Sequence, residues 1–204
     1  MSTVPSARPA APSPRYPISQ RVVADLVAHG RSPSGWTAGE QRWVVRGARP
    51  ADLAAVAAMH GRCSPGTLLQ RYRTGGRPPS LDHLVRLLRE PLTLVVEGRQ
   101  GVVALGTAEH PAADDFRSEV GLLVQDLWQG GGIGTVLALR LGSTLRSLGY
   151  AQVVTRSATA TVPLHRVLQR LGPVRTLERS PSTVLCARLT LPTVLHLGDD
   201  LTLG

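Results

Sequence analysis

The chain contains no lysine, two cysteines and few aromatic residues. Without lysine it cannot carry a P-loop, because the GxxxxGK[ST] motif places a lysine on the phosphates of the nucleotide. Cys63 and Cys186 are far apart and form no CxxC pair, so they do not make a zinc site together, and we expect two free thiols. Aromatic residues amount to only 3% of the chain, so leucine, valine and alanine must fill the core.

Long hydrophobic runs are absent as well. No stretch approaches the roughly 20 apolar residues that a transmembrane helix requires. The N-terminal residues lack the continuous apolar segment of a signal peptide. We therefore expect a cytoplasmic protein without a membrane partner.

The basic residues are all arginines, and they give the chain a formal net charge of +9. Such a charge is typical of nucleic-acid-binding proteins. The arginines, however, are spread along the whole chain and are not interleaved with aromatic residues. The pattern favours a solvated, arginine-rich surface and no nucleic-acid partner, and it leaves open a surface that attracts a polyanionic small molecule.

The composition divides the chain into four parts. Residues 1–17 form a tail rich in proline and alanine, which we expect to be disordered. Residues 18–41 form an N-terminal extension whose apolar cluster VVADLV suits a helix packed on the domain or on a second subunit, so a homodimer remains open. Residues 42–192 form the regular domain, and residues 193–204 form a C-terminal tail.

Hydrophobic periodicity in the regular domain predicts a mixed α/β domain with the order β-α-α-α-β-β-β-α-β-α-β-β. Helices are expected to begin at Pro50, at the Ser64-Pro65 pair and after Ser80, since serine caps helices and proline suits their first turn. Two later helices are expected over residues 133–149 and 161–172. Strands are predicted at residues 42–48, 92–98, 102–110, 119–124, 151–157, 174–180 and 182–191.

Four glycines crowd into five positions within residues 120–137, VGLLVQDLWQGGGIGTVL, between a predicted strand and a predicted helix. The first amides of a helix have no partner within it, and together with the helix dipole they bind anions of phosphate size. Glycine lets these amides approach a phosphate and permits positive φ. The stretch therefore predicts a cradle for a pyrophosphate.

The spacing of the glycines narrows the kind of cradle. The dinucleotide pattern GxGxxG fails, because its third glycine would fall on Thr135 or Leu137. The pattern that remains is Gln129-x-x-Gly132-x-Gly134. A tight turn that binds nothing is the alternative, but it would need only one or two glycines, and each costs about 0.5–1 kcal/mol in regular structure.

This pattern and its flanks, LLVQDLWQGGGIGTVL, resemble the acetyl-coenzyme A motif Q/R-x-x-G-x-G/A of the GNAT acyltransferase superfamily. The resemblance extends over about residues 44–191. The segment SPGTLLQRY is also similar to the corresponding segment of bacterial GNAT-type protein lysine acetyltransferases. The resemblance implies an α/β (α+β) fold with a mixed, mostly antiparallel central sheet, flanked by helices and splayed at the cofactor strand.

The resemblance further implies an acetyl-CoA-dependent N-acetyltransferase that acts on a primary amine of a small molecule or of a protein lysine. The cofactor strand would offer backbone groups to the pantetheine arm, and the amides of the glycine-rich turn would hold the pyrophosphate. The residues implied to bind the cofactor are Leu122, Leu123, Val124, Gln129, Gly130, Gly131, Gly132, Ile133, Gly134 and Thr135. No metal is expected.

Acetyl transfer to an amine also needs a base, because an amine of the lysine type has a pKa of about 10.4 and must lose a proton before it attacks. Glu119, at the start of the cofactor strand, is the first candidate, because related protein acetyltransferases resemble this sequence in having a glutamate there. An exposed glutamate without a catalytic role is the alternative. Glu109 and His110, at the end of the neighbouring strand, are the reserve candidates.

The sequence departs from the family pattern in its last helix. Many GNAT enzymes open this helix with asparagine and carry a tyrosine that acts as general acid, whereas the aligned residues here are Thr161 and Leu168. A thiol with a pKa near 8.5 is a tolerable leaving group without such an acid. The departure also leaves open a non-catalytic, coenzyme A-binding regulatory module.

Overall fold

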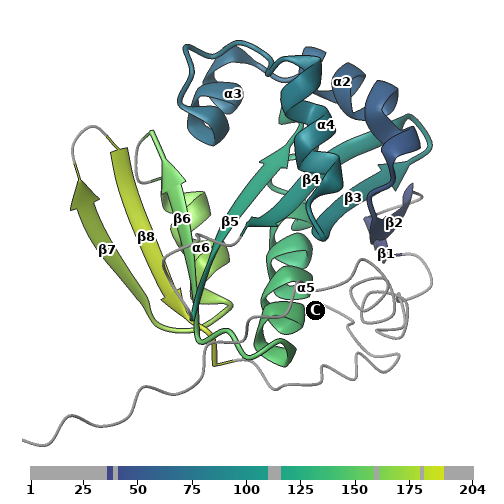
Figure 1. Ribbon diagram of the computed structural model, residues 1–204. Coiled ribbons are helices and arrows are strands. Elements are labelled where there is room, and N and C mark those ends of the chain that lie inside the picture. Colours follow the sequence, from purple (N-terminus) through teal and green to yellow (C-terminus); the bar gives the residue numbers. More distant parts are fainter. Residues whose placement is uncertain (1–35, 39–40, 110–115, 159–160, 180–181, 191–204) are drawn as a thin grey trace, which may run out of the picture.

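The computed structural model describes residues 36–38, 41–109, 116–158, 161–179 and 182–190, and these residues build one twisted sheet with helices on both faces (Figure 1). The described strands form an 8-stranded sheet in the order β1-β2-β3-β4-β5-β6-β8-β7. The strands are β1 (Trp36–Ala38), β2 (Gln41–Gly47), β3 (Leu92–Gly98), β4 (Gly101–Glu109), β5 (Arg117–Val124), β6 (Gln152–Ser157), β7 (Val174–Arg179) and β8 (Ser182–Arg188). The helices are η1 (Pro50–Asp52), α2 (Leu53–Gly61), α3 (Pro65–Tyr72), α4 (Leu81–Arg89), η2 (Asp126–Trp128), α5 (Ile133–Ser147) and α6 (Val162–Gln169).

The helices begin where the capping residues predict. The side chains of Ser64, Ser80 and Thr161 each accept a hydrogen bond from an amide in the first turn of α3, α4 and α6. The strand β1 lies in the N-terminal extension, where the sequence predicted no strand, and the cluster VVADLV lies outside the described residues. Each helix and strand predicted from residue 42 onward is therefore confirmed within the described residues, and β1 is an addition.

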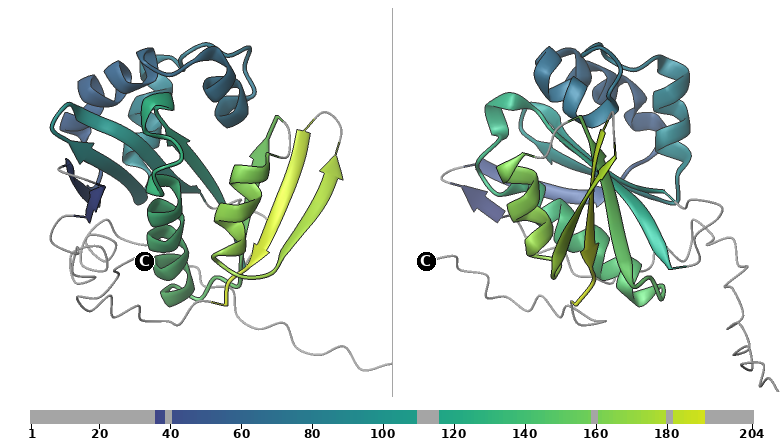
Figure 2. Two further views of the ribbon diagram at one scale, coloured as in Figure 1. Left: turned by 180° about the vertical axis from the view of Figure 1, so that it is seen from behind. Right: turned by 90° about the vertical axis from the view of Figure 1, so that its left-hand side faces the viewer.

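Two hydrophobic clusters lie on opposite faces of the sheet. One packs α5 and α6 against the strands, with Leu137, Leu141 and Leu145 of α5 fully buried. The other packs α2, α3 and α4 against the other face and contains Leu105 of β4, whereas its neighbour Ala104 belongs to the first cluster. Helix α4 thus lies in front of the sheet in Figure 1, and α5 lies in front of it in the reverse view (Figure 2).

Strands β5 and β6 separate along their length, and this is the feature that positions the site. Strand β5 pairs with β4 in antiparallel fashion from Glu119 to Val124. It pairs in parallel with β6 only over residues 117–119, after which the two strands diverge (Figure 1). The mostly antiparallel sheet, splayed at β5, is as predicted.

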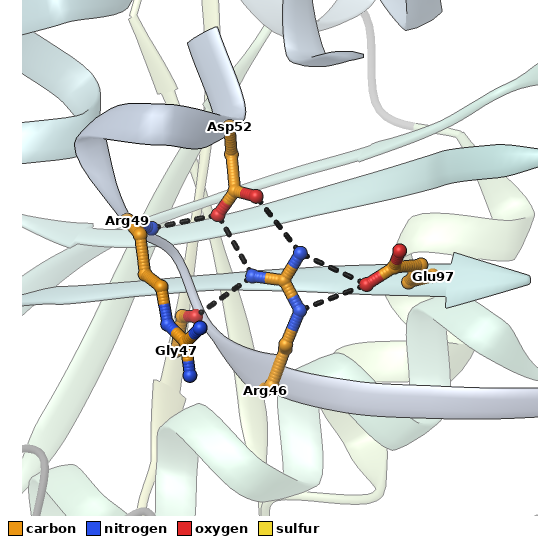
Figure 3. Close-up of polar contacts among 5 residues, drawn as sticks. All are labelled: Arg46, Gly47, Arg49, Asp52 and Glu97. Carbon is orange, nitrogen blue, oxygen red and sulfur yellow. Dashed lines mark hydrogen bonds and ion pairs between the residues drawn. The ribbon is translucent and has the colours of Figure 1, made fainter.

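A partly buried ion pair fixes the entry into the first helices. The Arg46 guanidinium on β2 donates to both carboxylate oxygens of Asp52, at 2.7 and 2.8 Å, and to Glu97 of β3 at 2.9 Å (Figure 3). The amide of Arg49 donates to Asp52 at 2.7 Å, and the carbonyl of Gly47 accepts from Arg46 at 3.3 Å. The hydrogen bonds from Arg46 hold the pKa of Asp52 below its usual value.

Replacing Arg46 with methionine is expected to destabilise the fold by about 2–3 kcal/mol, because it leaves the Asp52 carboxylate buried without its cation. The exposed Arg166 of α6 offers a matched control, since the same change there removes the same charge at a cost of about 0.5 kcal/mol or less. Urea unfolding measures both. Equal losses in the two variants would contradict a structural role for Arg46.

Candidate functional site

The glycine-rich stretch forms the turn between β5 and α5. Gly130 and Gly132 have φ of +79° and +84°, in the left-handed region that favours glycine. Gly132 is the N-cap of α5 and its carbonyl accepts the first helical hydrogen bond, from the amide of Val136 at 3.0 Å. The local geometry is therefore the predicted strand, turn and helix.

The amides of this turn are free. Within the described part of the chain, no backbone N–H from Gly130 to Thr135 has a hydrogen-bond acceptor, whereas the amide of Gln129 donates to the carbonyl of Asp126 at 3.1 Å. The Ile133 side chain is only 3% exposed, so it anchors the start of the helix in the core. Free donors on an anchored helix terminus form an anion site.

The side chains before the glycines fasten this turn to α3. The Gln129 amide group donates to the carbonyl of Val124 at 2.9 Å and to the Thr67 hydroxyl at 3.1 Å. The Asp126 carboxylate accepts from the amide and hydroxyl of Ser64, at 2.8 and 2.6 Å, and from the Thr67 hydroxyl at 2.8 Å. The spacing of the motif predicted the glycines, but these side-chain contacts were not foreseen.

Beyond the point where β5 separates from β6 lie three residues predicted to contact a cofactor, Leu122, Leu123 and Val124. Leu123 is buried in the cluster with α2–α4, and Leu122 and Val124 pack against the cluster with α5. The strand is bonded to β4 along one edge, and beyond Glu119 its other edge is not paired with β6. That edge leaves backbone groups available to an extended ligand.

Glu119 lies where the two strands part, opposite Val154 in the last β5–β6 pair. One of its carboxylate oxygens, Oε2, forms an ion pair with Arg156, and its Oε1 has no partner among the described residues. Glu109 is directly opposite Glu119 in the β4–β5 register, so both carboxylates project from the same face. His110 lies outside the described residues.

Helix α3 spans the separation between β5 and β6 (Figure 1). The Ser157 hydroxyl at the end of β6 donates to Gln70 Oε1 at 2.6 Å. On the other side, Arg71 Nη2 donates to the Thr107 hydroxyl of β4 at 2.8 Å. Sequence reasoning missed Arg71, and the only signal was its place in the segment SPGTLLQRY.

Helix α6 supplies no general acid at the position that aligns with the family tyrosine. Leu168 is 1% exposed and belongs to the hydrophobic core, while the Thr161 hydroxyl caps the helix. Tyr72, on α3, donates its hydroxyl to His60 Nε2 at 2.6 Å, and burial raises the pKa of Tyr72 to about 12. Neither Leu168 nor Tyr72 therefore offers a proton readily to a leaving group.

The described residues contain neither a metal-site cluster nor a membrane-spanning helix. No group of three histidine, cysteine, aspartate or glutamate side chains gathers there as a metal site would require. No helix in the same ranges has the length and apolar character needed to cross a membrane.

Comparison with known proteins gives a consistent fold. No protein-family model and no curated protein matches the sequence. The GNAT domain of S. lividans PAT matches with a TM-score of 0.64 and 18% identity, covering 76% of this chain and 99% of that chain. The yncA structure from Salmonella typhimurium, which contains acetyl-CoA, matches with a TM-score of 0.60 and 18% identity, covering 75% of this chain and 97% of that chain.

A third solved structure agrees. The phosphinothricin acetyltransferase of Sinorhizobium meliloti, in complex with acetyl-CoA, matches with a TM-score of 0.57 and 19% identity, covering 77% of this chain and 96% of that chain. These likenesses show that the chain has the GNAT fold, which confirms the fold class predicted from the sequence.

Proposed function

We propose that this chain, which has the GNAT fold, is an acetyl-CoA-dependent N-acetyltransferase that acts on a primary amine of a small molecule or of a protein lysine. The observation that carries the proposal is the row of free amides from Gly130 to Thr135, directly after a strand whose edge is open. Bound acetyl-CoA in two structures of the same fold supports the choice of cofactor.

The free amides and the start of α5 fit a pyrophosphate, because both donors and dipole favour an anion there. The open edge of β5, at Leu122, Leu123 and Val124, fits the pantetheine arm, which carries amide groups able to pair with a strand. Gln129 would act mainly through its side chain, which fastens the turn to the end of β5 and to α3. Bound acetyl-CoA would supply the acetyl thioester at this strand.

Glu119 is the proposed general base. It lies on the strand that would hold the thioester, and its Oε1 is free to accept the proton that the acceptor amine releases on attack. Arg156 would hold the other oxygen and so orient the carboxylate. The thiolate would leave without a tyrosine acid, as the buried Leu168 requires.

The buried Leu168 also favours the second candidate, a coenzyme A-binding regulatory module without catalysis. Both candidates would bind acetyl-CoA, but only the enzyme would release free thiol when an amine is present. The excess of arginine does not by itself indicate nucleic acid, because Arg46 and Arg62 are engaged within the fold. We retain the expectation of a cytoplasmic protein without nucleic-acid or membrane partners, with a homodimer left open.

A saturating addition of acetyl-CoA is expected to raise the melting temperature by roughly 5–10 °C at 100 times the Kd, since ligand binding at that level stabilises by about 2.7 kcal/mol. S-acetylpantetheine, which lacks the diphosphate and the nucleotide, is the control and should give a much smaller shift. Thiol release with a panel of amines then separates the enzyme from the regulatory module. Equal shifts with the two ligands would contradict the pyrophosphate site.

A further inference from the structure

Arg71 is a cation without an anion. Its guanidinium lies directly against Gly121 of β5, where a Cβ atom would come within 2.1 Å of Arg71 Cζ. The Nη2 group donates to the Thr107 hydroxyl, and the ring of Tyr72 is centred 5.0 Å from Cζ. The Nε group is buried and has no hydrogen-bond acceptor, and no carboxylate forms an ion pair with Arg71 in the described part of the chain.

A guanidinium with a buried, unsatisfied donor is costly, and arginines in such places are normally paired with acids. Arg46 shows the usual solution in this same protein, with two carboxylates around one guanidinium. The threonine hydroxyl and the aromatic ring offer Arg71 only partial dipoles. Among the described residues nothing gives Arg71 the charged partner that Arg46 has, so its guanidinium is suited to bind an anion of a ligand.

Arg71 lies close to the two carboxylates that are candidates for the general base. Thr107 and Gly121 are directly opposite each other in the β4–β5 register, and Glu109 and Glu119 form the next such pair on the same face. Residues two apart on a strand are about 6.6–6.8 Å apart. A positive group and two acids thus lie side by side on the strand proposed to hold the thioester.

An anion at Arg71 would be distinct from a pyrophosphate held by the glycine-rich turn. The free amides begin at Gly130, beyond the remaining residues of β5 and the η2 turn, whereas Arg71 contacts the middle of the strand. Helix α3 is also fastened at both sides of the strand separation, through Gln70 to β6 and through Arg71 to β4. The guanidinium is therefore held in place over the strand before any ligand arrives.

We propose that the acceptor is an amine that also carries a free carboxylate, as a free amino acid does, and that Arg71 binds this carboxylate. The inference rests on the proposed acetyltransferase function. The ammonium group of such an acceptor lies toward Glu119 and Glu109, which favour a cation and, in Glu119, provide the proposed base. A lysine within a protein chain has no such carboxylate, so the inference selects small molecules among the two acceptor classes.

The test compares each free L-amino acid with its own carboxamide, which keeps the amine and loses the negative charge. Thiol release from acetyl-CoA is the readout. The wild-type protein is expected to prefer the acid over the amide by roughly 100-fold in kcat/KM, the effect of losing one partner of a desolvated charge pair. The variant Arg71→Gln is expected to lose that preference, and Arg71→Lys to recover part of it. The acetyl-CoA thermal shift of each variant verifies that the fold and cofactor site are intact.

The outcomes separate the inference from the proposed function. Equal rates with acids and amides, or a preference for a lysine peptide with blocked termini, would overturn the inference alone. A preference that persists in Arg71→Gln would overturn the role of Arg71. An acetyl-CoA shift without thiol release from any acceptor would overturn the proposed catalysis, and the inference with it.

Discussion

Replacing Gly134 with aspartate is expected to weaken acetyl-CoA binding by about 1,000-fold or more while leaving the protein at least as stable as the wild type. A Cβ atom at this position meets only Val124 Cγ2, at 3.7 Å, which is an ordinary contact. An acidic residue in the first turn of a helix stabilises it by about 0.3–1 kcal/mol. The same carboxylate would compete for the free amides and repel the diphosphate, and losing two or three hydrogen bonds to a charged group costs about 4–6 kcal/mol.

The matched control is Gly134→Asn, which has the same size and no charge. Calorimetric titration should show binding within about 10-fold of wild type for asparagine and loss of binding for aspartate. Gly134 is a better position than Gly132, whose φ of +84° would strain any other residue and mix folding with binding. Similar affinities for the two variants would show that the diphosphate lies elsewhere.

The strand, turn and helix of this site were predictable because their signals are local. Gly130 and Gly132 occupy positions of positive φ, and the caps at Ser64 and Ser80 act within one turn of the chain. Leu137, Leu141 and Leu145 are spaced by one helical turn and are all buried. Each of these signals concerns residues within a few positions of one another, so no knowledge of the sheet order was needed.

The partners of the charged residues were not predictable for the opposite reason. Arg46 meets Glu97, and Arg71 meets Thr107, only because the sheet brings distant segments together. The sequence indicated Glu119 as a strand residue but could not show Arg156 beside it, because β5 and β6 are separated by the whole of α5. Residue type alone does not distinguish these arginines from those on the solvated surface.

Helix α3 connects the two halves of the site. Its first turn holds Asp126 and the Gln129 side chain beside the glycine-rich turn, and its last turn places Arg71 over the middle of β5. A rigid helix of 8 residues therefore links the proposed cofactor and acceptor positions. This arrangement gives a reason for the several side-chain hydrogen bonds that fasten α3 to the glycine-rich turn, to β6 and to β4.

Replacing Glu119 with glutamine is expected to lower kcat for acetyl transfer by about 100- to 10,000-fold, the usual contribution of a general base, with acetyl-CoA binding unchanged. Glutamine keeps the size of the side chain but cannot take the proton of the amine. The loss of the ion pair with Arg156 is a small effect, because exposed pairs contribute about 0–1 kcal/mol to stability. The melting temperature should therefore change little.

Two further variants make the interpretation specific. Arg156→Gln removes the same ion pair and leaves the carboxylate in place, so it should keep most of the activity if Glu119 acts as a base and not as a structural partner. Glu109→Gln tests the neighbouring carboxylate, which lies directly opposite Glu119 on the same face. A large loss of kcat in Glu109→Gln with full activity in Glu119→Gln would assign the base to β4. Full activity in both variants would mean that neither carboxylate acts as the base and that the amine enters already deprotonated. The rate would then rise with pH toward the pKa of the acceptor amine.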